Sequence, residues 1–325
     1  MLYLPVFTLL FSLVECGLHE KRLRNKLFDA NYYDKRERPV LNPQDSVHIT
    51  IKGDMVQIMD VDEQNQVIQT ILWLSFSWND YNFKWNPKEY GGLTSIVDKP
   101  DNIWMPDLIL YTSADSNFDQ MYKSMVVIHN YTEVFWMPPG FFRSTCQMHI
   151  KWFPFDHQEC KFKYGTWTHT SKLIRMSLDG NKTSVTNYVT NTEWALTEFD
   201  VRIDQDEQDF QYYYVTIHLQ RRSLYYLFNS ILPCLILSLI CLVQFGLPPD
   251  ANEKISLGVT ILLSVTYCLQ ITSEKLPPTS LDVPLICEYH LLSMQKATDS
   301  HLFLVHDVDE RWVTGQHHLA PQLSL

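Results

Sequence analysis

The sequence of 325 residues is long enough for one large domain or for two ordinary ones. Its 46% hydrophobic and 19% charged content excludes an intrinsically disordered protein, and only 10 glycines exclude a collagen-like repeat. The formal net charge of −11 argues against a nucleic-acid partner, because nucleic-acid binding needs a basic surface.

The first segment of the chain is an apolar and hydroxyl-bearing run, Met1–Val14, followed by the small residue Cys16. This pattern predicts a secretory signal peptide over residues 1–16, although the usual positive charge at its start is missing. A buried strand or a membrane anchor is the alternative, but the run is shorter than the about 20 residues that a spanning helix needs. Export would place the following residues in an oxidising compartment.

Residues 17–222 have the pattern of an all-β domain preceded by a helix near residues 18–28. Alternating apolar and polar residues, separated by turn residues, are typical of the strands of a sandwich. The segments that predict strands are Val47–Ile51, Val67–Trp78, Lys123–Ile128, Val134–Met137, Cys146–Trp152, Glu159–Trp167 and Tyr212–Leu219. We therefore expect an extracellular, immunoglobulin-like all-β sandwich.

Cysteine positions support an exported domain. If Cys16 leaves with the signal, Cys146 and Cys160 are the two cysteines left before the first apolar span, and we expect them to pair. A disulfide closing a loop of about 15 residues contributes about 3 kcal/mol in the chain-entropy model. Asn130 and Asn181 each begin an Asn-x-Thr triplet and are candidate N-glycosylation sites.

A transmembrane region is predicted over residues 223–294. Its first helix, about 224–247, carries no charged residue and follows Arg221 and Arg222. Pro233 lies inside this helix, and a bilayer tolerates proline there because unpaired backbone groups are so costly in lipid that the helix is retained.

The second helix, about 254–275, is uncharged between Lys254 and Glu274 but rich in hydroxyl groups. One helical face carries a largely polar stripe: Glu253, Ser256, Thr260, Leu263, Tyr267, Gln270 and Glu274. A polar stripe at membrane depth should line water or contact protein, and carboxylates at both ends would form rings that favour cations in an oligomer. An amphipathic surface helix is the alternative.

A third apolar segment starts at about 283–294 but is interrupted by Glu288 and followed by Lys296 and Asp299. We do not expect it to span a membrane. Residues 295–325 form a divergent C-terminal tail that is polar and rich in histidine.

Several motifs, in the same order along residues 20–294, resemble those of the Cys-loop pentameric ligand-gated ion channels. Cys146 and Cys160 enclose Trp152-Phe153-Pro154-Phe155-Asp156, which resembles the family signature. Further matches are Ile103–Asp107, Tyr111–Asp115, Gly165–Trp167, Leu247–Gly258 and Leu281–Ile286. The chain looks like a nicotinic acetylcholine receptor subunit, of an invertebrate or non-α type.

This resemblance implies a ligand-binding sandwich above a cation pore, assembled from five like or unlike subunits. Acetylcholine or another small cation would bind an aromatic box by cation–π attraction. The matching residues are Tyr111 and Trp167 on the principal face, with Phe210 or Tyr212 from the last loop, and Trp73 on the complementary face. Residues 253–274 would line the pore, and Asn252-Glu253-Lys254 is similar to the cation-selective branch.

The resemblance has three departures. The acidic segment Asp204–Tyr214 lacks the paired cysteines of α-type subunits, and Tyr267 and Gln270 replace residues that are usually aliphatic. The match also ends near Met294, so the transmembrane region is incomplete against the four-helix pattern. A C-terminally truncated or alternatively spliced subunit fits this, and a non-conducting subunit that binds ligand or modulates assembly is the alternative to a channel subunit.

No enzyme motif, metal site or cofactor site is evident in the sequence. We expect a non-enzymatic receptor at the plasma membrane, in contact with lipid and postsynaptic, with its N-terminal domain extracellular.

Overall fold

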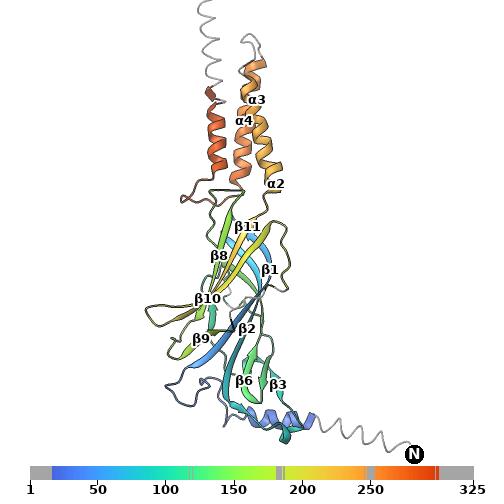
Figure 1. Cartoon of the computed structure of the whole chain (residues 1–325), viewed down its shortest axis with the longest axis vertical. Helices are drawn as coiled ribbons and strands as arrows, with labels where there is room; N and C mark the ends of the chain where they lie inside the picture. Colours follow the sequence, from blue (N-terminus) through green and yellow to red (C-terminus); the bar gives the residue numbers. More distant parts are fainter. Residues whose placement is uncertain are drawn as a thin grey trace, which may run out of the picture.

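The chain forms an elongated molecule with a β domain at one end and helices at the other (Figure 1). The structure is a computed structural model that describes residues 17–116, 118, 120–180, 185, 187–244, 246, 253–296 and 298–299, without the side chains of residues 253–255. The predicted signal over residues 1–16, the candidate site Asn181 and most of the tail 295–325 lie outside these residues.

Eleven named strands build the β domain. They are β1 (Val47–Asp62), β2 (Val67–Lys84), β3 (Ser95–Asp98), β4 (Leu108–Leu110), β5 (Val126–His129), β6 (Tyr131–Trp136), β7 (Pro139–Thr145), β8 (His157–Thr166), β9 (Ile174–Leu178), β10 (Trp194–Gln205) and β11 (Gln211–Arg221). Two short 3-10 helices, Pro87–Tyr90 and Pro100–Asn102, lie between β2 and β4.

The strands form two sheets. One has the order β3-β5-β6-β2-β1-β9, with β7 also paired to β2, and the other has the order β10-β11-β8-β4. Alternate residues of β2 and β8 are buried, as expected for strands with one face on a core. The core between the sheets contains large side chains from both, including Phe142, Phe162, Trp194 and Tyr213. The predicted sandwich is confirmed.

The N-terminal helix covers residues 17–27, close to the predicted 18–28. Leu23 and Leu27, which lie on one face at i and i+4, are fully buried against the sandwich, whereas Leu18 is exposed. This helix caps the end of the β domain that lies away from the other helices (Figure 1).

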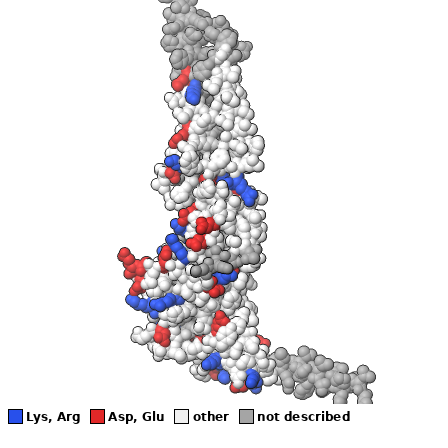
Figure 2. Space-filling model, viewed as in Figure 1, with Lys and Arg blue, Asp and Glu red and all other residues white. Residues whose placement is uncertain are grey.

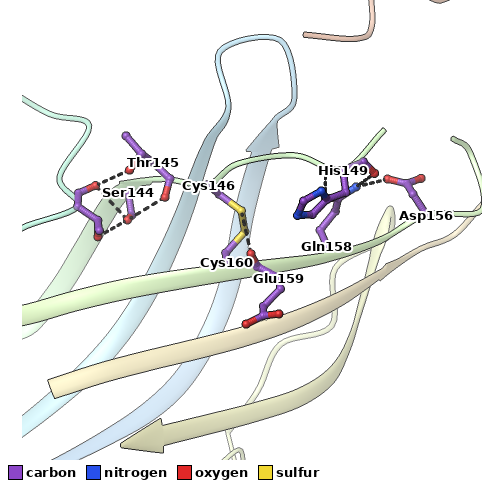
Figure 3. The surroundings of a disulfide bond; sticks show 9 residues. Ser144, Thr145, Cys146, His149, Asp156, Gln158, Glu159 and Cys160 are labelled. Carbon is purple, nitrogen blue, oxygen red and sulfur yellow. Dashed lines mark hydrogen bonds between the residues drawn. A yellow bond between two sulfur atoms is a disulfide. The ribbon is translucent and has the colours of Figure 1, made fainter. Parts of the chain in front are cut away.

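The strand predicted over Cys146–Trp152 is wrong, although burial alternates from Cys146 to Ile150. The Gln158 side chain accepts a hydrogen bond from the His149 backbone N–H at 2.8 Å and donates one to its carbonyl at 3.0 Å. Figure 3 shows this amide beside the disulfide. A side chain thus satisfies backbone groups that a neighbouring strand would otherwise pair.

The first membrane helix comprises α2 (Leu224–Tyr226), a π-helical turn (Leu227–Ile231) and α3 (Leu232–Gln244). Pro233 has no N–H for the carbonyl of Asn229, and the wide turn directly before it accommodates the missing bond. The second helix, α4 (Glu253–Ser273), runs beside α3 (Figure 1). Among the described residues, Leu224–Gln244 and Ser256–Ser273 are long and apolar enough to cross a membrane.

A third helix, residues 285–296, packs beside the other two. Ser238 on α3 hydrogen bonds to the Tyr289 hydroxyl at 2.5 Å, and Met294 contacts the small cluster of Cys241, Ile261 and Val265. On the face drawn in Figure 2, charged side chains gather over the β domain and are sparse over α3 and α4. That distribution suits helices surrounded by lipid.

Candidate functional site

Three aromatic side chains from three separate segments meet at one end of the smaller sheet. Tyr111 follows β4, Trp167 follows β8 and Tyr212 lies on β11. The ring centroid of Tyr111 is 5.6 Å from that of Trp167 and 5.4 Å from that of Tyr212, which stands edge-on to it. We call these three residues the aromatic cluster. Their faces together offer a surface for a cation.

Strand pairing brings the cluster together. The Tyr111 N–H donates to the Lys163 carbonyl at 2.8 Å, and its hydroxyl donates to the Thr166 carbonyl at 2.8 Å. Tyr212 pairs with Gly165 across β8 and β11. A Cβ on Gly165 would lie 2.7 Å from the Tyr212 ring and 3.1 Å from the Tyr111 ring, so glycine is needed for both rings to approach.

Trp167 is 63% exposed on the single chain, and hydrogen bonds join its loop to Asp107. The Trp167 N–H donates to the Asp107 carbonyl at 3.2 Å, and the Thr168 N–H donates to the Asp107 carboxylate at 2.7 Å. His169 also contacts that carboxylate at 3.1 Å. These bonds hold an exposed indole at a fixed position.

The cluster already holds a cation that belongs to the chain. The Lys163 ammonium lies 3.6 Å from the centroid of the Tyr212 ring and 5.3 Å from that of Tyr111. Sequence reasoning missed Lys163. The signal available was its place two residues before Gly165, which puts both residues on one face of β8.

The turn before β11 orients Tyr212. The Asp206 carboxylate accepts a hydrogen bond from the Tyr212 hydroxyl at 3.0 Å and others from the backbone N–H groups of Gln208 and Phe210. Burial, followed by this hydrogen bond, raises the pKa of Tyr212 to about 12. The hydroxyl therefore stays protonated and neutral at physiological pH.

Two of the predicted box residues lie apart from the cluster. Phe210 is half-buried in the turn before β11 and makes no ring contact with the cluster among the described residues. Tyr212, the alternative from the same loop, does contact Tyr111. Trp73 is half-buried on β2 of the other sheet, where it pairs with Asp54 and Pro139. One chain therefore brings together Tyr111, Trp167 and Tyr212 but not Trp73.

A buried charge cluster lies where the β domain joins the membrane helices. The fully buried Arg221 side chain contacts the Asp156 carboxylate at 2.8 Å and also pairs with Glu63 and Glu193. Its guanidinium stacks 4.1 Å from the Trp194 ring centroid. Burial opposes the charge, but Asp156 and Glu63 outweigh it and raise the pKa of Arg221.

The loop closed by Cys146 and Cys160 contacts the segment after α4. The two Cα atoms lie 5.0 Å apart and the predicted disulfide is present. The Leu285 N–H donates to the Lys151 carbonyl at 3.1 Å, and His149 lies 3.7 Å from the Asp282 carboxylate. This loop thus joins the β domain to the third helix.

The polar stripe of α4 faces away from α3. Its described members are all exposed, namely Ser256, Thr260, Leu263, Tyr267, Gln270 and Glu274. Ile261 and Val265, on the opposite face, are buried with Cys241 of α3. The Glu253 backbone begins the helix, but its side chain lies outside the described residues.

The half-buried Asn130, a predicted glycosylation site, lies between β5 and β6.

Two family models match the chain. The neurotransmitter-gated ion-channel ligand binding domain matches residues 20–223, and the neurotransmitter-gated ion-channel transmembrane region matches residues 230–298. Together they cover the β domain, α3, α4 and the third helix, and leave residues 224–229 at the start of the first membrane helix unmatched.

Three relatives illustrate the similarity. The Caenorhabditis elegans acetylcholine receptor subunit alpha-type acr-16 is 39% identical over 94% of this chain and 61% of its own length. The human neuronal acetylcholine receptor subunit alpha-6 is 35% identical over 99% of this chain and 66% of its own length. The Drosophila melanogaster acetylcholine receptor subunit beta-like 1 is 37% identical over 91% of this chain and 58% of its own length. The chain thus spans about three fifths of the length of these relatives.

Proposed function

Because this chain belongs to the neurotransmitter-gated ion-channel family, we propose that it is a subunit of a pentameric, cation-selective channel opened by acetylcholine or another small cation. The family consists of ligand-gated membrane channels with an extracellular ligand-binding domain, not of enzymes. We place this subunit at the plasma membrane of a postsynaptic cell. The observation that carries the proposal is the Lys163 ammonium on the Tyr212 ring, since a ring that holds one ammonium can hold another.

The ligand site is proposed to form between two subunits. Tyr111, Trp167 and Tyr212 supply the principal face, with Phe210 at its edge. Trp73 lies in the other sheet of the same chain, so its indole would close the box of a neighbouring subunit in a ring. Burial between subunits would remove water from the exposed face of Trp167 and strengthen its attraction for a cation.

The pore is proposed to be lined by α4. In a ring of subunits with α3 outside, the exposed stripe from Ser256 to Glu274 faces the axis, and Leu263 forms an apolar girdle. Glu253 and Glu274 form carboxylate rings about 31 Å apart at a rise of 1.5 Å per residue, which matches the thickness of the hydrocarbon core. Such rings favour cations over anions.

The function is tested by voltage-clamp recording from cells that express the full chain, alone and with a complete acetylcholine receptor subunit. Acetylcholine should evoke a current whose reversal potential follows the sodium gradient and not the chloride gradient. Ligand binding at the cell surface without any current contribution would favour the non-conducting alternative. An acetylcholine-evoked current that follows chloride would contradict the proposed selectivity.

Replacing Glu274 with glutamine should lower the inward single-channel conductance, roughly by half, because a ring of like charges at the pore mouth concentrates cations there. Single-channel recording in low salt measures the change, which should shrink at high salt as screening increases. Glu288→Gln, the same change on the exposed face of the third helix, is the matched control. Equal effects of the two substitutions would place Glu274 outside the pore mouth.

Replacing Lys163 with methionine should raise the affinity for a cationic ligand about threefold to tenfold. Methionine keeps most of the apolar stem but removes the ammonium that competes for the Tyr212 ring, an interaction worth about 1 kcal/mol. Equilibrium displacement of a labelled ligand measures the change. Lys161→Met is the control, because Lys161 lies on the same strand and pairs with Glu159 at 2.7 Å. A loss of affinity would show that Lys163 positions Tyr212 for the ligand and does not compete with it.

A further inference from the structure

All four free cysteines of the described residues lie in the membrane helices, namely Cys234 and Cys241 on α3, Cys268 on α4 and Cys287 on the third helix. Cys234 is buried, Cys268 is partly exposed, and their two thiols are hydrogen-bond partners. We call these two residues the thiol pair. Neither the aromatic cluster nor the polar stripe of α4 includes them, so the proposed function does not account for them.

The packing of α3 against α4 explains why the thiol pair meets. The hydroxyl oxygens of Ser230 and Thr272 lie 3.3 Å apart on one side of the pair, and Cys241 packs with Ile261 on the other side. On both helices the thiol pair lies four residues from the first contact and seven from the second. Residues at these spacings share one face of a helix, so antiparallel packing places the two cysteines opposite one another.

Facing positions of packed helices suit a disulfide. The axes of packed helices lie about 8–10 Å apart, and each Cα atom lies about 2.3 Å from its own axis. Cα atoms that face one another directly are therefore about 3.4–5.4 Å apart, which overlaps the range of about 4.4–6.8 Å that a disulfide spans. The two helices need no large movement for the thiol pair to bond.

We propose that the thiol pair is a redox-sensitive modification site, which a hydroperoxide converts into a reversible disulfide between α3 and α4. Because that bond joins the pore-lining helix to its neighbour, it opposes any movement of α4 and keeps the pore closed. This consequence rests on the proposed channel function, whereas the formation of the bond does not.

Each disulfide consumes one hydroperoxide. The Cys268 thiolate, next to Tyr267 of the polar stripe, attacks an oxygen of hydrogen peroxide, which breaks the O–O bond and gives a sulfenic acid and one water. The Cys234 sulfur then attacks the Cys268 sulfur, the S–S bond forms, and the sulfenic hydroxide leaves with the thiol proton as a second water. Two thiols are oxidised and one peroxide is reduced, and excess dithiothreitol reverses the bond by thiol–disulfide exchange.

The site is tested on the full chain in the membranes of expressing cells. The cells are treated with hydrogen peroxide, the remaining thiols are blocked with N-ethylmaleimide, and the chain is digested with trypsin without reduction. Residues 223–254 form one tryptic peptide with Cys234 and Cys241, and residues 255–275 form the next, in which Cys268 is the only cysteine. Mass spectrometry should find these two peptides linked after peroxide treatment and separate after dithiothreitol.

Serine variants identify the partners in the linked peptide. Cys234→Ser and Cys268→Ser should each abolish it. Cys241→Ser is the matched control, because Cys241 lies on the same face of α3 but packs with Ile261, and this variant should retain the linkage. No linkage in the wild type, a linkage that survives in Cys234→Ser, or one that is lost in Cys241→Ser would overturn the proposal.

Voltage-clamp recording with a complete partner subunit tests the consequence for the pore. Peroxide should lower the acetylcholine-evoked current about tenfold, because a crosslink that fits the closed state shifts the equilibrium toward it. Dithiothreitol should restore the current, and Cys268→Ser should be insensitive to peroxide. Linked peptides with an unchanged current would overturn the effect on the pore. Since the linkage is read without ligand or current, a failure of the channel function is distinguishable from a failure of the thiol pair.

Discussion

Replacing Arg221 with glutamine should destabilise the protein by about 3–5 kcal/mol, the cost of breaking a buried ion pair from one side. Arg221 is completely buried and contacts both oxygens of Asp156, at 2.8 and 3.2 Å. Asp156 is itself 2% exposed, so the substitution would leave its charge buried without a cation. This is the largest effect that we expect of a single substitution.

The measurement is the thermal unfolding of the full chain in detergent, together with its abundance at the cell surface. Arg222→Gln is a matched control, because the neighbouring Arg222 side chain is exposed and its loss should change stability little. Arg221→Lys should unfold at a temperature between those of the wild type and Arg221→Gln, because lysine keeps the charge but cannot form the two parallel hydrogen bonds to Asp156. If Arg221→Gln unfolds at the wild-type temperature, the charge cluster has no structural role.

Replacing Trp167 with alanine should lower the affinity of the receptor for a cationic ligand about 30-fold. This corresponds to the loss of about 2 kcal/mol of cation–π attraction at a desolvated ring. The indole is the most exposed member of the aromatic cluster, at 63%, and its loop is held by Asp107. Because Trp167 is exposed in the single chain, its removal should leave folding intact.

Equilibrium binding of labelled acetylcholine to full-length receptors, formed with a complete partner subunit if needed, measures this loss. Tyr32→Ala removes another exposed aromatic ring, 57% exposed near the N-terminal helix, and should leave the affinity unchanged. An unchanged dissociation constant in Trp167→Ala would place the ligand elsewhere.

The sequence predicted the parts of the fold that depend on local pattern. The sandwich, the N-terminal helix, the two apolar spans and the pairing of Cys146 with Cys160 are present. Each of these has a signal within a short window, namely a period of two, a period near 3.6, a long uncharged run or a cysteine count.

The site was only partly predictable. Tyr111 and Trp167 were named from motifs, Tyr212 was one of two alternatives with Phe210 in the loop that departs from the family pattern, and these three rings do meet. Lys163 and Asp206 emerged from the structure because their roles depend on pairing between β8 and β11. The strand expected over Cys146–Trp152 failed for a similar reason. Its alternating burial is real, but the side chain of Gln158 takes the hydrogen bonds that a partner strand would make.

The most direct test of the central claim, that the aromatic cluster binds a cation, compares two ligands of the same shape. Choline carries a quaternary nitrogen, and 3,3-dimethyl-1-butanol replaces that nitrogen with carbon. Choline should bind more tightly to wild-type receptors, and Trp167→Ala should reduce this preference about 30-fold by removing the ring that distinguishes charge. An equal loss of affinity for both ligands in Trp167→Ala, or equal affinities for the two ligands in the wild type, would contradict the account.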